Sequence, residues 1–140
     1  DTLMDKNYSI NDFMAKKLIT FNPETPIEIA IESFLKNKIS GAPVVNKNGD
    51  LVGVLSEKDC MRTLLESTYY NYLGGYVKEY MSQKVEYVSI HDTLSSVADR
   101  FMNSRFRRYP VMNSKKLVGQ ISRRDVLRAI VKLSKGKKIK

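Results

Sequence analysis

Two short motifs with the same spacing could do chemistry in this sequence. Ser56 is followed three residues later by Asp59, and Ser122 by Asp125. One interpretation is a capping box, in which the serine caps a helix and the acidic residue reaches back to the helix start. The other is a binding site, because a helix N-terminus offers unpaired N–H groups and a favourable dipole to an anion. The motifs alone leave both interpretations open.

Arginines surround the second motif. The run Arg107–Pro110 carries two of them, and Arg123 and Arg124 follow Ser122 directly. A guanidinium group presents a rigid fork of donors that suits phosphate. Positive charge in the first turn of a helix opposes the helix dipole, so a nearby anion would relieve it. The alternatives are a solvated basic loop with Tyr109 as an ordinary strand residue, and two arginines that point into solvent.

The positive charge is concentrated in the second half of the chain. The 140 residues carry a net charge of +9, from 24 basic and 15 acidic residues. Residues 1–70 hold 8 basic and 10 acidic side chains, whereas residues 71–140 hold 16 basic and 5 acidic ones. This asymmetry indicates an anionic partner: nucleic acid, an acidic lipid surface or a phosphorylated small molecule.

Composition excludes several functional classes. Cys60 and His91 are the single cysteine and histidine, which excludes an internal disulfide and leaves no nucleophile–base pair or metal cluster. The hydrophobic fraction is 42%, typical of a globular domain, and no apolar run reaches the roughly 20 residues of a membrane span. We therefore expect a soluble cytoplasmic protein that is not an enzyme, binds no metal and crosses no membrane.

The elements that position the motifs occur twice. An offset of 67 residues aligns Phe34 with Phe101 and Pro43 with Pro110, and an offset of 66 aligns Asp59 with Asp125. Each copy predicts the order β-α-β-β-α, with a hairpin turn of the Asn-Gly type in the first copy. The predicted elements of the first copy are a strand at Lys17–Phe21, a helix capped by Thr25, strands Pro43–Asn46 and Leu51–Leu55, and a helix from Ser56 to Ser67. Those of the second are a strand at Val85–Ser89, a helix capped by Asp92, strands Pro110–Asn113 and Leu117–Ile121, and a helix from Ser122 to Ser134.

Apolar residues at helical spacing predict the buried face of the first helix in each copy. These residues are Ile27, Ala30, Ile31, Phe34 and Leu35 in one copy and Leu94, Val97, Ala98, Phe101 and Met102 in the other. The connection between the copies is tyrosine-rich, and Gly74-Gly75 interrupts it. We expect a linker that ends in a short helix, with its tyrosines packed on the other repeat or on a dimer partner; a stacking platform for single-stranded nucleic acid is the alternative.

At this point the sequence resembles a tandem pair of CBS (cystathionine-beta-synthase) domains. The resemblance rests on Gly41–Val45, on Gly53–Asp59 and on Gly119–Asp125, and it covers residues 10–131. It implies an α+β fold of two repeats packed sheet to sheet about a pseudo-twofold axis, with two clefts between them. The expected segments are an N-terminal extension (1–9), a first repeat (10–68), a linker (69–76), a second repeat (77–134) and a basic tail (135–140).

The resemblance further implies clefts that bind adenosine compounds (AMP, ADP, ATP or S-adenosylmethionine) and frequent dimerisation. In the family the Asp accepts hydrogen bonds from ribose hydroxyls, the chain before the proline faces the base, and a basic residue there contacts phosphate. The first copy departs from this pattern, since Ser40 and Gly41 provide no cation. The candidate nucleotide-binding residues are Thr20, Ala42, Pro43, Ser56, Asp59, Tyr87, Arg107, Arg108, Tyr109, Pro110, Ser122, Arg123 and Asp125.

We thus predict a regulatory module that senses an adenine nucleotide, forms a homodimer and uses no catalytic cofactor. One alternative is a nucleic-acid-binding protein that uses the basic second half, for which affinity would fall steeply with salt. Another is a structural dimerisation module whose clefts stay empty.

Overall fold

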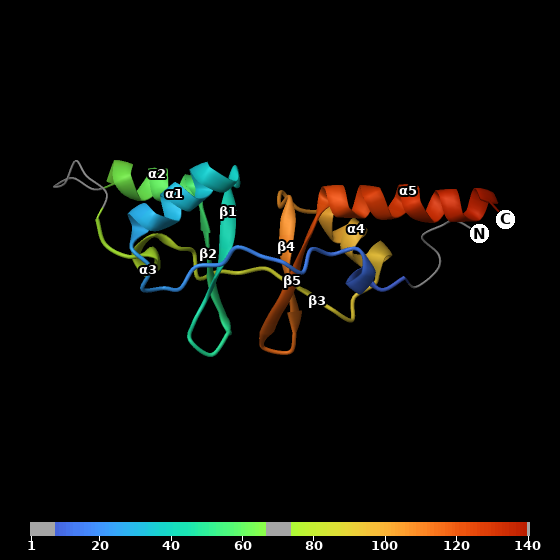
Figure 1. Ribbon diagram of the computed structural model, residues 1–140, viewed down its shortest axis with the longest axis horizontal. Coiled ribbons are helices and arrows are strands. Elements are labelled where there is room, and N and C mark those ends of the chain that lie inside the picture. The colour runs from blue at the N-terminus through green and yellow to red at the C-terminus, as the bar shows by residue number, and fades with distance from the viewer. Residues whose placement is uncertain (1–7, 67–73, 140) are drawn as a thin grey trace. The chain divides into compact units, whose positions relative to one another are not determined.

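The computed structural model describes residues 8–66 and 74–139, which form two compact units. Ile19–Val85 make up one of them, called the central unit here. The other, called the split unit, joins the described residues up to Leu18 with those from Glu86 onward. Both contain helices and antiparallel strands, which confirms the predicted α+β class and the twofold use of one arrangement (Figure 1).

The central unit is built on one hairpin. Helix α1 (Ile27–Asn37) precedes strands β1 (Gly41–Val45) and β2 (Leu51–Ser56), which are followed by helices α2 (Glu57–Glu66) and α3 (Val77–Tyr80). The turn between the strands has Gly49 at φ 81°, a left-handed conformation that favours glycine. The Asn46 side chain accepts hydrogen bonds from the amides of Asn48 and Asp50, so the predicted Asn-Gly hairpin is confirmed.

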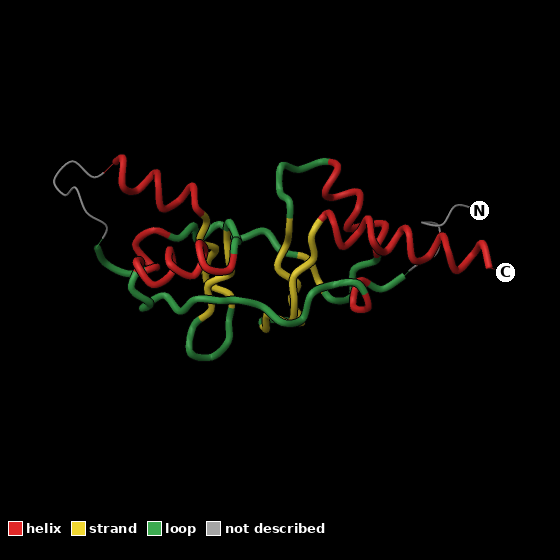
Figure 2. The backbone as a smooth tube through the Cα atoms, turned by 45° about the horizontal axis from the view of Figure 1, so that its top comes forward, coloured by secondary structure: helices red, strands yellow, loops and turns green. Residues whose placement is uncertain are grey.

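The split unit repeats this plan with a third strand and an added segment. Strand β3 (Val88–Ser89) pairs in parallel with β4 (Arg108–Asn113), which pairs antiparallel with β5 (Lys116–Ser122). Helix α4 (Leu94–Met102) precedes the hairpin and α5 (Arg123–Ile139) follows it. The N-terminal segment, with the short 3-10 helix η2 (Ile10–Asp12), pairs through Ala15 with Gln120 of β5. Figure 2 shows this segment as a tube that passes the strands of the split unit.

The opening strand of each copy is shorter than predicted. In place of a strand at Lys17–Phe21, Phe21 alone makes a bridge with Val44, and the second strand is only Val88–Ser89. The turn in which the Thr25 amide donates to the Asn22 carbonyl takes the chain away from the hairpin at once. Pro23 inside this turn restricts the backbone before it and cannot donate to a strand partner.

Both predicted helix caps are wrong by one residue. Helix α1 has Pro26 at its N-cap, and the amide of Ile27 donates to the carbonyl of Gly75 at 3.0 Å. The hydroxyl of Thr25 accepts from the Asn22 amide instead. Helix α4 is capped by Thr93, whose hydroxyl accepts from the Ser96 amide, because Asp92 is used to close the preceding turn with Ser89.

The helix faces are largely as predicted. Ile27, Ala30 and Phe34 are buried in the core of the central unit, and Leu94, Val97 and Phe101 in that of the split unit. Leu35 and Met102, which occupy the same place in the two copies, were expected inside but are 71% and 83% exposed. Each follows a buried phenylalanine by one residue, which turns its side chain about 100° further around the helix.

The linker ends in the short helix α3, as predicted. The Glu79 carboxylate accepts from the Tyr76 amide at 3.0 Å, and the Tyr80 hydroxyl donates to the Gly74 carbonyl at 2.7 Å. Tyr69 and Tyr72 lie outside the described residues, so their predicted packing is not addressed.

Candidate functional site

Three separate chain segments meet at the start of α2. Register pairing places Gly41 opposite Ser56 and Ala42 opposite Leu55, and the amide of Glu57 donates to the carbonyl of Ser40 at 3.0 Å. The amide of Phe21 donates to the carbonyl of Pro43, which sets Thr20 beside the edge of β1 that faces away from β2. The candidates Thr20, Ala42, Pro43, Ser56 and Asp59 therefore gather in the central unit and form what is called the first candidate site.

The same meeting occurs at the start of α5. Arg108 pairs with Ser122 and Tyr109 with Ile121, and the amide of Arg123 donates to the carbonyl of Arg107 at 3.0 Å. Parallel pairing of Val88 with Val111 sets Tyr87 next to Pro110. The second candidate site, in the split unit, comprises Tyr87, Arg107, Arg108, Tyr109, Pro110, Ser122, Arg123 and Asp125.

The serine and aspartate of the first site form a closed capping box. The amide of Asp59 donates to the Ser56 hydroxyl oxygen at 3.1 Å, and Asp59 Oδ2 accepts from both the amide and the hydroxyl of Ser56, at 3.0 and 2.9 Å. Asp59 is only 8% exposed and is the buried charged residue of the described chain. The capping interpretation is thus correct for Oδ2 of Asp59, while Oδ1 of the same residue makes a second contact.

That second contact is with an arginine one turn further along. Arg62 Nη1 donates to Asp59 Oδ1 at 3.0 Å, although the Arg62 side chain is 59% exposed. The second site has the same pair, with Arg128 Nη1 2.9 Å from Asp125 Oδ1. An exposed guanidinium can swing into solvent at little cost. In each site the aspartate Oδ2 is held in the capping box, while Oδ1 contacts an exposed arginine.

Sequence reasoning gave these two arginines no role. The signal was present, because Arg62 and Arg128 align in the repeat and follow the aspartates by three residues. Residues three apart on a helix lie on the same face.

The helix N-termini are less open to anions than expected. In α2 the amide of Glu57 is bonded to Ser40 and that of Asp59 to Ser56. In α5 the amides of Arg123 and Asp125 are used in the same way. Two of the first three amides in each helix are thus satisfied within the protein, which leaves less of the anion-binding capacity that a bare helix end offers. An anion at either helix start would therefore depend mainly on side-chain donors.

Of the candidate arginines, Arg107 and Arg108 keep that role open. Arg107 is exposed and Arg108 is half-buried at the first position of β4. Arg123 is different: its Nε donates to the Phe106 carbonyl at 2.9 Å and its Nη2 to the Ser104 carbonyl at 3.1 Å. Arg123 is an exposed residue, and these two hydrogen bonds tie the loop before β4 to α5.

Tyr109 is a core residue, and its ring cannot bracket a base from where it lies. It is 1% exposed, packs 4.8 Å from the ring of Phe101, and donates its hydroxyl to Ser104 Oγ at 2.7 Å. The guanidinium carbon of Arg100 lies 4.7 Å from the centre of the same ring. Only the backbone of Tyr109 remains available at the site, which agrees with the alternative of an ordinary strand residue.

Arg100 also fixes the backbone at Tyr87. Its Nη1 donates to the Tyr87 carbonyl at 2.6 Å, and its Nη2 lies 3.7 Å from Glu86. Position 33, which aligns with position 100, is a serine in the first copy. The two candidate sites therefore differ in how firmly their opening segment is held, as well as in their arginines.

Cys60 and His91 are the single cysteine and the single histidine of the chain. Burial, followed by the nearby Asp59 carboxylate, raises the pKa of Cys60 to about 11, so its thiol is protonated and unreactive at neutral pH. His91 is exposed, beside the turn at Ser89. Among the described residues, no group of three or more His, Cys, Asp or Glu could hold a metal ion. None of the helices that the structure describes combines the length and hydropathy that a bilayer crossing requires.

Comparison with known proteins identifies relatives of the whole arrangement. A family model described as CBS domain matches residues 10–66 and 77–132. The uncharacterized protein MJ1225 of Methanocaldococcus jannaschii is 30% identical over 124 residues, which cover 89% of this chain and 43% of that protein. The gamma-3 subunit of the 5'-AMP-activated protein kinase of Sus scrofa is 32% identical over 113 residues, covering 76% of this chain and 22% of the subunit. The chain thus spans less than half the length of these two relatives.

Solved structures share the fold along nearly all of the chain. CBSX2 of Arabidopsis thaliana, crystallised in complex with AMP, is 30% identical with a TM-score of 0.79, covering 91% of this chain and 98% of that one. The CBS domain pair of MJ0100, solved with 5'-methylthioadenosine and S-adenosyl-L-methionine, has a TM-score of 0.74 at 21% identity, covering 91% and 98%. At that identity the second likeness concerns the fold alone.

Proposed function

The chain belongs to the CBS domain family, and from this premise we propose that it is a regulatory module that binds an adenine nucleotide at the two candidate sites. The observation that carries the proposal is the pair of aspartates in the capping boxes. Asp59 and Asp125 hold the same place in the two units, and each keeps one carboxylate oxygen outside its capping box. A vicinal diol, such as that of ribose, matches an acceptor of this kind.

The surroundings of each aspartate suit the rest of a nucleoside. The backbone of β1 or β4 and the opening segment at Thr20 or Tyr87 offer amide and carbonyl groups to the edge of a base. CBSX2, a relative with 30% identity, was crystallised with AMP. Arg107 and Arg108 supply phosphate contacts to the second site alone, since the first copy has no cation at the matching positions. We therefore propose that the second site has the higher affinity for nucleotides with phosphate groups.

Regulation follows if bound nucleotide favours one arrangement of the protein over another. A ligand shifts such an equilibrium only by the difference in its affinity for the two states. We propose that the responsive assembly is a homodimer, whose mass can be measured by light scattering after gel filtration with and without AMP.

Isothermal titration calorimetry tests the binding proposal directly. AMP, ADP, ATP, S-adenosylmethionine and, as a control, GMP are titrated into the folded protein at constant ionic strength. We expect heat from at least one adenosine compound and not from GMP. No binding of any adenosine compound by a sample with an intact melting transition would refute the proposal. Binding of duplex or single-stranded nucleic acid that weakens steeply with salt would instead support the alternative partner.

A further inference from the structure

The two candidate sites differ in charge at three aligned positions. In two of them an uncharged residue of the first site corresponds to an arginine of the second, and in the third a glutamate corresponds to an arginine. The pairs are Ser40 and Arg107, Gly41 and Arg108, and Glu57 and Arg123. The first two exchanges add one positive charge each and the third adds two, so the second site is more positive by four charges.

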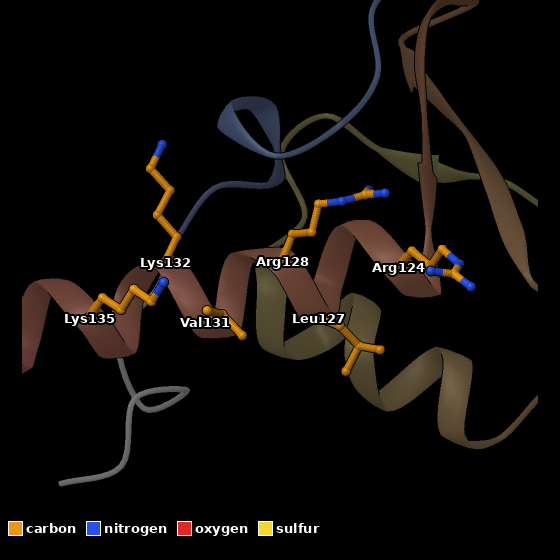
Figure 3. A pocket seen from close by; sticks show the side chains of 6 residues that line it. All are labelled: Arg124, Leu127, Arg128, Val131, Lys132 and Lys135. Carbon is orange, nitrogen blue, oxygen red and sulfur yellow. The ribbon is translucent and has the colours of Figure 1, made fainter.

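The other charged positions around the two helix starts are alike. Three cations and one aspartate stand at the same places in both copies: Lys38 and Arg105, Lys58 and Arg124, Arg62 and Arg128, Asp59 and Asp125. Figure 3 shows Arg124 and Arg128 on the first turns of α5. Arg100 has a serine as its counterpart, but its Nη2 lies 3.7 Å from Glu86, and this pair carries no net charge. The difference in charge between these groups thus comes from the three exchanged positions.

Backbone hydrogen bonds hold the three positions together in each unit. The amide of the first helical residue donates at 3.0 Å to the carbonyl of the residue before the strand, Glu57 to Ser40 and Arg123 to Arg107. Strand pairing sets the remaining position, 41 or 108, opposite the serine of the capping box. Positions 57 and 123 precede the aspartates by two residues, within one helical turn. A ligand held by either aspartate therefore meets the electric field of all three positions.

The charges at the exchanged helix position act on their surroundings. Glu57 is exposed, and after burial and Asp59 it is a further cause of the raised pKa of Cys60. Arg123 keeps its positive charge, because its side chain donates to two carbonyl groups, which are uncharged. Exposed charges interact over about 8 Å at physiological salt, so these groups influence a bound ion without touching it.

We propose that the two sites divide adenosine compounds by the charge of the group on the ribose 5′ carbon, and that Glu57 is the residue that excludes phosphate from the first site. The inference rests on the proposed function, because it concerns ligands of the same two sites. A phosphate group carries about 1.5 to 2 negative charges at neutral pH. The first site therefore takes adenosine compounds whose 5′ group is uncharged or cationic, and the second takes phosphorylated ones.

The test uses three ligands that differ only in the 5′ group. They are AMP, adenosine and 5′-amino-5′-deoxyadenosine, whose 5′ groups are anionic, uncharged and cationic. Each is titrated into the ¹⁵N-labelled full chain, and NMR follows the amide signals of Ser56 and Asp59 for the first site and of Ser122 and Asp125 for the second. At the first site we expect the amine to bind most tightly and AMP most weakly, with the reverse order at the second. The ratio of the AMP affinity to the amine affinity should differ at least tenfold between the sites.

Variants of the first site assign the effect to its residues. Glu57→Gln removes the carboxylate at nearly constant size, so AMP should bind there at least threefold more tightly and the amine more weakly. Ser40→Arg with Glu57→Arg, both at exposed positions, should reverse the order of affinities. Gly41 is left in place, because an added Cβ would lie 3.1 Å from the Leu55 carbonyl oxygen. The matched control Asp50→Asn removes one negative charge at the other end of β2, roughly 20 Å from Ser56, and should leave the order unchanged.

The results that overturn the charge division differ from those that overturn nucleotide binding. The same order of affinities at both sites would refute the division alone, and so would a first site that binds none of the three ligands. A Glu57→Gln variant with the parent's ratio of AMP to amine affinity at the first site would also refute it. If no ligand moves the signals of either site in a folded sample, the proposed function fails and the division fails with it.

Discussion

Replacing the site aspartates by asparagine separates their two roles, capping and ligand binding. Asp125 Oδ2 accepts from the Ser122 amide at 2.9 Å, and Oδ1 accepts from Arg128. Asparagine keeps an amide oxygen for the first bond and loses the charge needed for the second. Alanine would lose both, so Asp125→Asn is the cleaner perturbation.

The cost to stability follows from the exposure of the partner. The Arg128 side chain is 70% exposed, so the lost ion pair is worth roughly 0.2–1 kcal/mol. Removing negative charge from the first turn of α5 costs a further 0.3–1 kcal/mol or so. The free energy of unfolding should therefore fall by about 1 kcal/mol, a decrease in melting temperature of a few degrees.

The cost to binding is larger if the carboxylate accepts ribose hydroxyls. Hydrogen bonds to a charged group contribute about 1.5–3 kcal/mol, so AMP should bind about 10- to 100-fold more weakly at the altered site. Asp59→Asn and Asp125→Asn should each weaken AMP binding at one site and leave binding at the other site unchanged. Calorimetry on both variants, with Lys137→Ala in the basic tail as control, measures this.

The decisive comparison sets binding against stability. If Asp59→Asn and Asp125→Asn each lower the melting temperature as expected but leave the affinity for AMP unchanged, the aspartates are caps and nothing more. The reasoning that assigns them to the ligand would then be refuted, even if the protein binds AMP elsewhere.

Four further substitutions test individual positions. Gly119→Ala should lower the free energy of unfolding by about 1–3 kcal/mol, because the added methyl group would lie 2.7 Å from a backbone carbonyl oxygen. Gly136→Ala, which has no other atom within 4 Å of the added methyl group, should stabilise α5 by up to about 1 kcal/mol. Urea denaturation measures both changes. The raised pKa of Cys60 means that the folded state favours the protonated thiol, so its contribution to the free energy of unfolding is complete below pH 9 and is lost as the pH rises to about 11. Cys60→Ala should reduce this loss of stability at alkaline pH. An unchanged dependence of stability on pH would contradict the prediction. Arg100→Ala should free the Tyr87 carbonyl and weaken AMP binding at the second site about 3- to 10-fold without affecting the first site. Calorimetry in an Asp59→Asn background measures binding at the second site. An equal loss of affinity at the first site, measured in an Asp125→Asn background, would indicate general unfolding.

The sequence predicted those features that depend on short-range chemistry. The hairpin at Asn46 forms because an Asn side chain closes its own turn, and the Ser56–Asp59 box forms because both partners lie within one helical turn. Repetition of the pattern then predicted that the two aspartates hold equivalent places, with neither turned out to solvent.

Features decided by distant partners escaped prediction. The start of α1 is set by Gly75, nearly fifty residues away, so the residues around Thr25 alone did not predict the correct N-cap. Tyr109 was a candidate nucleotide-binding residue, but its ring packs beside Phe101 in the core. Arg123 was expected to face an anion or solvent, and its hydrogen bonds to the carbonyl groups of Ser104 and Phe106 were not predicted.

The split unit has a consequence for the order in which the chain can fold during synthesis. The amide of Ala15 donates to the carbonyl of Gln120, and the amide of Gln120 donates back to Ala15. The central unit is contiguous in sequence, so all its partners have been made once Val85 leaves the ribosome. The segment around Ala15, by contrast, is made before the central unit but can pair only after β5 has been made. Closing so long a loop slows the search for native contacts, so the central unit should fold first and the split unit should fold after it.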